Sequence, residues 1–338
     1  MSPVLPRRRL LLSAALAPVA AAALPRPALS VIADARPVRL VVPYPAGGAV
    51  DLVGRLLAPG MEASLGQPVV VENRSGAAGI VGADAVAKAR SDGTTLGIIG
   101  MTTLCAYPAL YRRLPFDPQR DFAPVSQVSA GTVVCAVNKA AAARQGWTDF
   151  PALVAWAKAN PDGLRFGTAG VGTTAHLTMA AIQKATGLQA LHVTYRGGAP
   201  AVADLQAGVI DMMFELTPGL MPLIAQDEIT PLAVGSARRL PVLPQVPGMA
   251  EFGALGLDGL DIGAWEAVMA PAATPAETIA ALHAAVRSAG EDATMRAKLR
   301  ETGFVVETSA TPAALRDRIL RETPMWRRLV ETSGATLD

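Results

Sequence analysis

The sequence predicts an α/β protein made of two units, each a mainly parallel sheet flanked by helices. Short, β-branched runs bounded by Gly, Pro or Asn alternate with longer segments whose apolar residues are three and four positions apart. This alternation occurs twice along the chain, and 51% of the 338 residues are hydrophobic, which is enough to build two cores. Because parallel strands need helical crossovers, the pattern indicates parallel sheets with helices on both faces.

The expected elements divide the chain at residues 138 and 262. The first unit, 36–138, should have strands at 38–42, 68–72, 94–99 and 132–137 and helices at 50–65 and 77–89. The second unit, 139–262, should have strands at 164–166, 192–195, 210–214 and 231–234 and helices at 148–159, 174–185 and 199–207. Residues 263–338 should add a strand at 266–269 and further helices. Periodicity does not show which unit they join, and we expect them to return to the first.

Two helix starts in this last segment are marked by their sequence. Thr274-Pro275-Ala276-Glu277 combines an N-cap residue, a first-turn proline and a capping-box glutamate. Thr311-Pro312 should begin the last helix in the same way.

Residues 1–35 have the form of a cleavable export signal. Arg7-Arg8-Arg9 precedes an uncharged apolar run over 10–24, which is too short to anchor a mature protein in a bilayer. Ala33-Asp34-Ala35 is the expected cleavage motif, with cleavage before Arg36, and Ala21-Ala22-Ala23 is the alternative. The arginines fit either a twin-arginine signal or an ordinary secretory signal. We therefore expect a soluble, exported protein.

Charge and motif content exclude several classes of function. The formal charge of +2 comes from residues 1–35, so the remaining chain lacks the clustered basic excess of a nucleic-acid-binding protein. No G-x-S-x-G, G-K-[ST] or H-E-x-x-H motif occurs, and the three histidines are far apart. Residues 170–175 match G-x-G-x-x-A, but the next predicted strand ends without the acidic residue that a dinucleotide site needs. We expect neither catalysis nor a cofactor or metal.

The chain has two cysteines, Cys105 and Cys135. Export would permit a disulfide between them, but a protein of this size does not need one for stability. We interpret both as small core residues.

Two glycine turns point to ligand binding. Gly47-Gly48 lies between a predicted strand and a predicted helix of the first unit, and Gly197-Gly198 lies at the same kind of position in the second. Ligands of parallel α/β sheets bind where strand ends lead into helix N-termini. Glycines admit a ligand to the backbone, and free helix N–H groups favour an anion. Two facing turns would form a two-sided anion clamp, although the same glycines could simply make tight turns.

Several ordered motifs resemble the Bug (TctC-type) solute receptors of tripartite tricarboxylate transporters. Residues 42–51, VPYPAGGAVD, are similar to the family's V-P-[FY]-x-P-G-G-x-x-D. Further similar blocks stand at 65–79 (LGQPVVVENRSGAAG), 92–96 (DGTTL), 121–125 (DFAPV), 172–177 (GTTAHL), 195–198 (YRGG) and 265–275 (WEAVMAPAATP). The blocks extend from about residue 39 to the last helix and so cover nearly the whole mature chain.

The resemblance implies a two-lobed periplasmic binding protein, type II-like, whose lobes close on a small ligand in the cleft between them. Its ligand would be a small organic carboxylate: a di- or tricarboxylate, an acidic amino acid or an aromatic acid. Its partners would be the membrane subunits of a transporter. The alternative is a ligand-sensing protein that signals to the ectodomain of a two-component sensor kinase. In either case we expect a monomer.

The candidate ligand-binding residues lie where predicted strands lead into helices. They are Tyr44, Gly47, Gly48, Ala49, Asp51, Thr102, Thr103, Gly170, Thr173, Thr174, His176, Arg196, Gly197 and Gly198. Each side chain among them has a structural alternative. Asp51 either caps free helix N–H groups or accepts from the ligand, and Tyr44 either walls the ligand or packs the strand end. The threonines either cap helices or donate to the ligand, and His176 either holds its loop or touches the ligand.

Arg196 is the one cationic candidate, and its alternative is a solvated side chain. Three departures from the family pattern leave the identity of the ligand open. Ala46 replaces a common proline, Val50 replaces a common hydroxyl residue, and Glu266-Ala267 follows Trp265 where the family often has a glycine.

Overall fold

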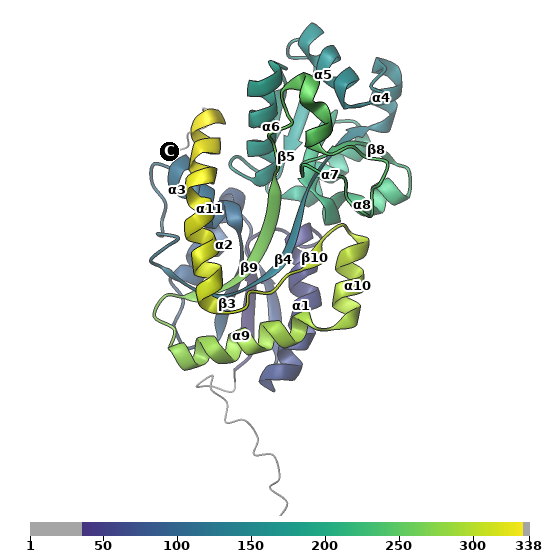
Figure 1. Ribbon diagram of the computed structural model, residues 1–338. Coiled ribbons are helices and arrows are strands. Elements are labelled where there is room, and N and C mark those ends of the chain that lie inside the picture. Colours follow the sequence, from purple (N-terminus) through teal and green to yellow (C-terminus); the bar gives the residue numbers. More distant parts are fainter. Residues whose placement is uncertain (1–35, 334–338) are drawn as a thin grey trace, which may run out of the picture.

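A computed structural model describes residues 36–333 of the chain. The predicted export signal and both of its possible cleavage motifs lie outside these residues. None of the helices in the described range has the length and apolar character that crossing a bilayer requires. The described chain forms two lobes, and two long strands run between them (Figure 1).

The long strands β4 and β9 link the lobes. The first part of β4 (Phe122–Asn138) pairs antiparallel with β9 (Gly263–Pro271) and β10 (Val305–Val306). Its second part pairs antiparallel with β7 (Met212–Leu216) and β8 (Ile229–Val234). The strand order is β2 (Val69–Asn73), β1 (Val38–Val42), β3 (Thr95–Gly100), β9, β4, β7, β5 (Arg165–Thr168) and β6 (Leu191–Thr194). We call the part around β1, β3 and β9 lobe 1, and the part around β5, β7 and β8 lobe 2.

Lobe 1 starts with three parallel strands and their helical crossovers. β1 (Val38–Val42) lies between β2 (Val69–Asn73) and β3 (Thr95–Gly100). Helix α1 (Ala49–Leu65) leads from β1 to β2, and α2 (Ile80–Ala87) precedes β3. The strands are apolar and almost wholly buried at β1 and β3, as expected of central strands covered on both faces.

The C-terminal segment packs into the core of lobe 1. Helix α9 (Ala276–Gly290) lies against α1, and α10 (Ala293–Glu301) follows it. Helix α11 (Pro312–Ser333) contacts β4 and, in lobe 2, α6 (Thr174–Thr186). In Figure 1, α11 stands beside the two long strands and reaches from one lobe toward the other. This helix therefore touches both lobes.

Lobe 2 is a second sheet with helices on both faces. β5 (Arg165–Thr168) pairs in parallel with β6 (Leu191–Thr194) and with β7. Its helices are α4 (Lys139–Gln145), α5 (Phe150–Ala159), α6, α7 (Gly198–Ala207) and α8 (Thr217–Ala225). Separate apolar clusters form around Phe166 and Phe214 and around Leu205 and Met213, which are the two faces of this sheet.

The two-lobed α/β class is confirmed, but the sheets are mixed. The strand expected at 132–137 is only the second part of β4, and the first part was missed because polar residues interrupt its apolar pattern. Because β4 and β9 run antiparallel to their neighbours, each lobe combines parallel strands with antiparallel ones.

Local structure also departs from the expected helix starts. Helix α9 begins at Ala276, and the Thr274 hydroxyl donates to the Pro271 carbonyl instead of capping the helix. Thr311 does cap α11, since its hydroxyl accepts from the backbone N–H of Ala314. The helix expected at 77–89 is interrupted at its start, because Ala77 and Ala78 adopt positive φ angles before α2 begins.

Cys105 and Cys135 are both buried and unbonded. Burial raises the pKa of each thiol well above its ordinary value, and Cys105 reaches about 12. They are core residues, as interpreted.

Candidate ligand-binding site

A cavity of about 190 Å³ lies between the lobes. Lobe 1 contributes the loop after β1, the N-terminus of α1, the end of β3 and part of β9. Lobe 2 contributes the N-termini of α6 and α7 and the end of β7. The lining residues are Tyr44, Pro45, Gly47, Gly48, Ala49, Val50, Gly100, Met101, Thr102, Val133, Ala169, Thr173, Thr174, Ala175, Gly198, Ala199, Val202, Glu215, Leu216, Gly219, Ala264, Trp265 and Glu266.

The turn before α1 is held by a buried carboxylate. Gly47 has a φ of 83°, and its N–H donates to Asp51 Oδ2 over 2.9 Å. Arg55 Nε donates to the same oxygen, and Asn73 Nδ2 donates both to Asp51 Oδ1 and to the Tyr44 carbonyl. Burial would raise the pKa of Asp51, but the hydrogen bonds from Arg55, Gly47 and Asn73 hold it below its ordinary value. Asp51 is therefore an ionised support for the turn.

Gly48 leaves the first N–H groups of α1 open toward the cavity. It occupies the N-cap position of α1, where no side chain caps the helix. Its φ of −83° is an angle that any residue can adopt. The first N–H groups of a helix have no intrahelical acceptor and favour negative charge. The α1 start is thus a set of backbone donors on the lobe 1 wall.

Lobe 2 presents two more helix starts to the same cavity. The Thr173 hydroxyl donates to the Gly170 carbonyl over 2.8 Å and caps α6, while His176 Nδ1 accepts from the Gly172 N–H over 3.1 Å. Helix α7 starts at Gly198 without a side-chain cap. Three helix N-termini, from two lobes, therefore border one cavity.

His176 supports its loop as a neutral imidazole. Its ring stacks on His192 with the ring centroids 4.7 Å apart. Burial, together with the charge of His192, lowers the pKa of His176 to about 4. Because its Nδ1 is already an acceptor for Gly172, the side chain holds the turn before α6.

The charged residues among the described lining are Glu215 of β7 and Glu266 of β9. Glu215 Oε1 accepts from the N–H of Leu216 over 2.9 Å, whereas Glu215 Oε2 and Glu266 Oε2 have no hydrogen-bond partner in the described structure. Glu215 is 7% exposed and Glu266 is 5% exposed. Burial raises the pKa of Glu215 to about 7 and that of Glu266 to about 8.

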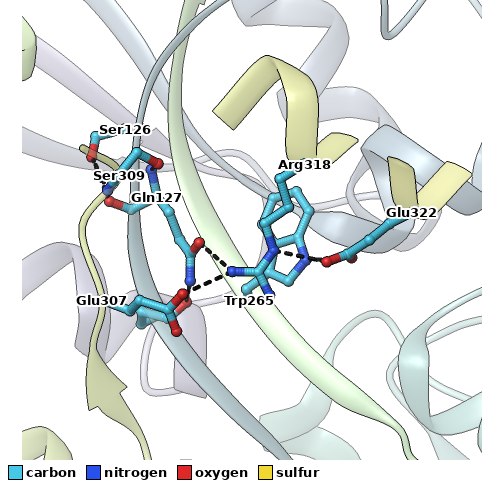
Figure 2. A network of polar contacts seen from close by, with 8 residues as sticks. Ser126, Gln127, Trp265, Glu307, Ser309, Arg318 and Glu322 are labelled. Carbon is cyan, nitrogen blue, oxygen red and sulfur yellow. Dashed lines mark hydrogen bonds and ion pairs between the residues drawn. The ribbon is translucent and has the colours of Figure 1, made fainter. Parts of the chain in front are cut away.

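Trp265 forms part of the cavity wall, and residues of α11 hold its side chain in position. Figure 2 shows its indole next to Arg318 and Glu322 of α11. Trp265 Nε1 donates to Glu322 Oε2 over 2.7 Å, and the Arg318 guanidinium carbon lies 5.2 Å from the centroid of the indole. Arg318 Nε in turn donates to Glu322 Oε1 over 2.8 Å. Helix α11 therefore sets the position of a cavity residue.

The lobes are in contact around the cavity. A Cβ on Gly197 of lobe 2 would lie 2.4 Å from Pro45 Cδ of lobe 1. A Cβ on Gly170 would lie 3.0 Å from the Cβ of Ala78, whose carbonyl accepts from the hydroxyls of Tyr44 and Tyr107. Glycines thus allow the two lobes to touch, and we describe this arrangement as closed.

The structure brings part of the predicted set into the cavity. The predicted residues that line it are Tyr44, Gly47, Gly48, Ala49, Thr102, Thr173, Thr174 and Gly198. Those that do not line it are Asp51, Thr103, Gly170, His176, Arg196 and Gly197. Of these, Asp51 and His176 support turns, Thr103 is buried in the segment after β3, and Arg196 is exposed. Gly170 and Gly197 lie at the contacts between the lobes.

Sequence reasoning missed Glu215, Glu266 and Trp265 as cavity residues. The sequence could have indicated the two glutamates as site residues, because each is a charged residue within or next to a run predicted as a buried strand. A charge in such a place needs a reason, since burial of an unpaired carboxylate is costly.

The fold and the cavity define a two-lobed solute-binding protein. A family model described as the tripartite tricarboxylate transporter family receptor, TctC, matches residues 53–334. The chain belongs to this family.

Individual relatives are similar to this chain over most of its length. The chain is 39% identical over 295 residues to the UPF0065 protein in the tcbD-tcbE intergenic region of Pseudomonas sp. (strain P51), covering 87% of this chain and 85% of that protein. The periplasmic binding protein BugD superposes with a TM-score of 0.84 at 30% identity, covering 90% of this chain and 99% of its own. R. palustris Rpa4515, solved with adipate, has a TM-score of 0.83 at 31% identity and covers 90% and 99%.

Proposed function

We propose that this protein is a periplasmic solute-binding receptor that closes on a small organic carboxylate and presents it to a tripartite membrane transporter. The observation that carries the proposal is the meeting of three helix N-termini, those of α1, α6 and α7, at one cavity between the lobes. Each supplies backbone N–H groups that favour an anion. A solved relative that holds adipate supports a carboxylate as the ligand.

Closure would couple binding to delivery. A carboxylate held by neutral backbone donors needs groups from both lobes, so it should shift the population from open toward closed. A membrane partner that recognises only the closed form would then accept loaded receptors. Residues 1–35 have the form of an export signal, which supports export of the protein to the periplasm, where it would bind its ligand.

The test uses protein freed of bound ligand by unfolding and refolding. Mono-, di- and tricarboxylates and amino acids are screened by thermal shift, and every binder is measured by small-angle scattering. At a hundredfold excess over its dissociation constant, a binder should add about 2.7 kcal/mol to the free energy of unfolding. It should also reduce the radius of gyration. A tight binder that leaves the scattering curve unchanged would refute closure, and chemical conversion of the ligand would refute the receptor assignment.

A further inference from the structure

The charge of the cavity does not match a ligand that is anionic at both ends. Among the described lining residues, the charged groups are two glutamates, and no Lys, Arg or His faces them. A dicarboxylate would bring two more negative charges. Its carboxylates would share the cavity with Glu215 and Glu266, and the ionised forms of these side chains would repel them.

Both glutamates are built into the cavity wall. Glu266 packs on Gly100, where a Cβ would lie 2.9 Å from Glu266 Oε2. Glu215 packs on Gly198, where a Cβ would lie 2.6 Å from Glu215 Oε2. Glycine at both positions leaves room for these carboxyl groups. Each is more than nine-tenths buried, and one oxygen of each has no hydrogen-bond partner in the described structure.

The two carboxyl groups also come from opposite lobes. Glu266 lies on β9 opposite Gly100 of β3, and Glu215 lies on β7 opposite Val134 of β4. A cation between them would therefore draw lobe 1 and lobe 2 together, whereas two ionised carboxylates without it would push them apart. Burial raises the pKa of the Tyr44 phenol, and the charges of Glu266 and Glu215 raise it further, so Tyr44 is a titratable group that both glutamates influence.

We propose that the ligand is an amine-bearing carboxylate, whose ammonium group binds at Glu215 and Glu266 while its carboxylate binds at the N-termini of α1 and α6. This proposal rests on the proposed function and names its ligand class. It pairs the two charges of one small zwitterion with two kinds of group that line the cavity, carboxylates and backbone N–H donors. It also explains why two buried carboxylates have free oxygens, because an ammonium group supplies up to three hydrogen-bond donors.

The raised pKa values of the two glutamates determine how binding should depend on pH. Burial raises them to about 7 for Glu215, against the opposing hydrogen bond from Leu216, and to about 8 for Glu266, so without a cation the closed cavity takes up protons at neutral pH. An ammonium ligand would lower both pKa values again and make the carboxylates its partners. Affinity for such a ligand should therefore rise as the pH increases from 5 to 8, whereas affinity for a dicarboxylate should fall.

The decisive probes are pairs of acids with equal spacers. 5-Aminopentanoate is compared with adipate, and 4-aminobutanoate with glutarate, and the proteinogenic amino acids and 1,5-diaminopentane complete the panel. Calorimetry measures each against the refolded wild type and against Glu215→Gln, Glu266→Gln and the exposed control Glu291→Gln. At least one amine-bearing acid should bind more than tenfold tighter than the dicarboxylate of equal spacer. Glu215→Gln and Glu266→Gln should each weaken it more than tenfold, and Glu291→Gln should not.

The other outcomes separate this inference from the proposed function. If dicarboxylates bind preferentially and Glu266→Gln strengthens them, the inference is overturned and the carboxylate receptor stands. If 1,5-diaminopentane binds and no carboxylate binds, the cavity does not require an acid group and the proposed carboxylate receptor function is refuted. If no amine-bearing acid binds the wild type, or if binding is indifferent to both Glu→Gln changes, the inference is overturned as well.

Discussion

The indole N–H of Trp265 donates a 2.7 Å hydrogen bond to Glu322, which connects the wall of the ligand cavity to the C-terminal helix. Arg318 bonds to the other oxygen of Glu322 and also to Glu307, on the segment that leads to α11 (Figure 2). Since α11 contacts both lobes, the position of the indole depends on a helix that lies outside the cavity.

The first prediction concerns this connection. Glu322→Ala removes the acceptor of a buried indole N–H and an ion-pair partner of Arg318, so it should lower the free energy of unfolding by about 1–3 kcal/mol. Ligand affinity should fall as the indole becomes mobile, and its fluorescence should become more accessible to quencher. Glu331→Ala, an exposed change on the same helix, is the control. Equal unfolding curves and quenching for both variants would contradict the role given to Glu322.

The second prediction concerns contact between the lobes. Gly197→Ala places a Cβ 2.4 Å from Pro45 Cδ and so should oppose closure. The ligand-bound radius of gyration should stay near the ligand-free value, and affinity should fall more than tenfold. Gly187→Ala is the control for a positive φ without a lobe contact, because no atom lies within 4 Å of an added Cβ there. Gly197 has a φ of 128°, which strains alanine more than the φ of 75° at Gly187, so the ligand-free unfolding curve of Gly197→Ala measures that strain separately. A similar loss in both variants would mean that backbone strain, and not blocked closure, is responsible.

The third prediction concerns the α1 turn. At Gly48 the backbone is unstrained for other residues, and the nearest atom to an added Cβ is the Pro45 carbonyl oxygen at 3.6 Å. Gly48→Val should therefore fold, but its methyl groups would cover the helix N–H groups and reduce affinity more than tenfold, or over about 1.4 kcal/mol. Gly259→Val, at an exposed loop with open space, is the control. Unchanged calorimetric affinity in Gly48→Val would remove this turn from the site.

The elements set by local sequence were predictable. The alternation of apolar strand and amphipathic helix predicted β1 and α1 to within a residue, because propensity, pattern and turn glycines agree there. The first part of β4 was not predictable, because buried Ser126 and Gln127 break its pattern. Their polar groups are matched by Ser309 and Arg318, nearly two hundred residues away in sequence.

Some features of the site also follow from local sequence, and others depend on how distant elements pack. A glycine turn before a helix predicts backbone donors from local sequence, and the Gly48 and Gly198 turns do line the cavity. Glu215 and Glu266 lie on different strands, and only packing brings both to one cavity. The support roles of Asp51 and His176 likewise depend on which donors the fold places beside them.

The last prediction concerns pH and the ligand-free protein. Glu215 and Glu266 have pKa values of about 7 and about 8 in the closed form, above the ordinary value of 4.5. Each carboxyl group packs on a glycine of its own lobe, so we expect much of its burial to persist when the lobes open. Their protonation therefore contributes stability that is fully present below pH 4.5 and is lost as the pH rises through 8. His176 and His192 act in the opposite direction, because their lowered pKa values contribute stability that is lost as the pH falls below 6.5.

The interval from pH 6.5 to 8.5 therefore isolates the glutamates. Across it, the two carboxyl groups lose their protons in the folded state, which lowers the free energy of unfolding of ligand-free wild type by about 3 kcal/mol. The unfolding temperature should therefore fall by several degrees, since about 1 kcal/mol shifts a protein of this size by a few degrees. Glu266→Gln keeps the shape and cannot ionise, so its curve should be flatter and should lie above that of the wild type at pH 8.5. Glu291→Gln should follow the wild type. If wild type and Glu266→Gln show the same pH dependence, the glutamates are solvated when the lobes are open, and their pKa values are raised only on closure.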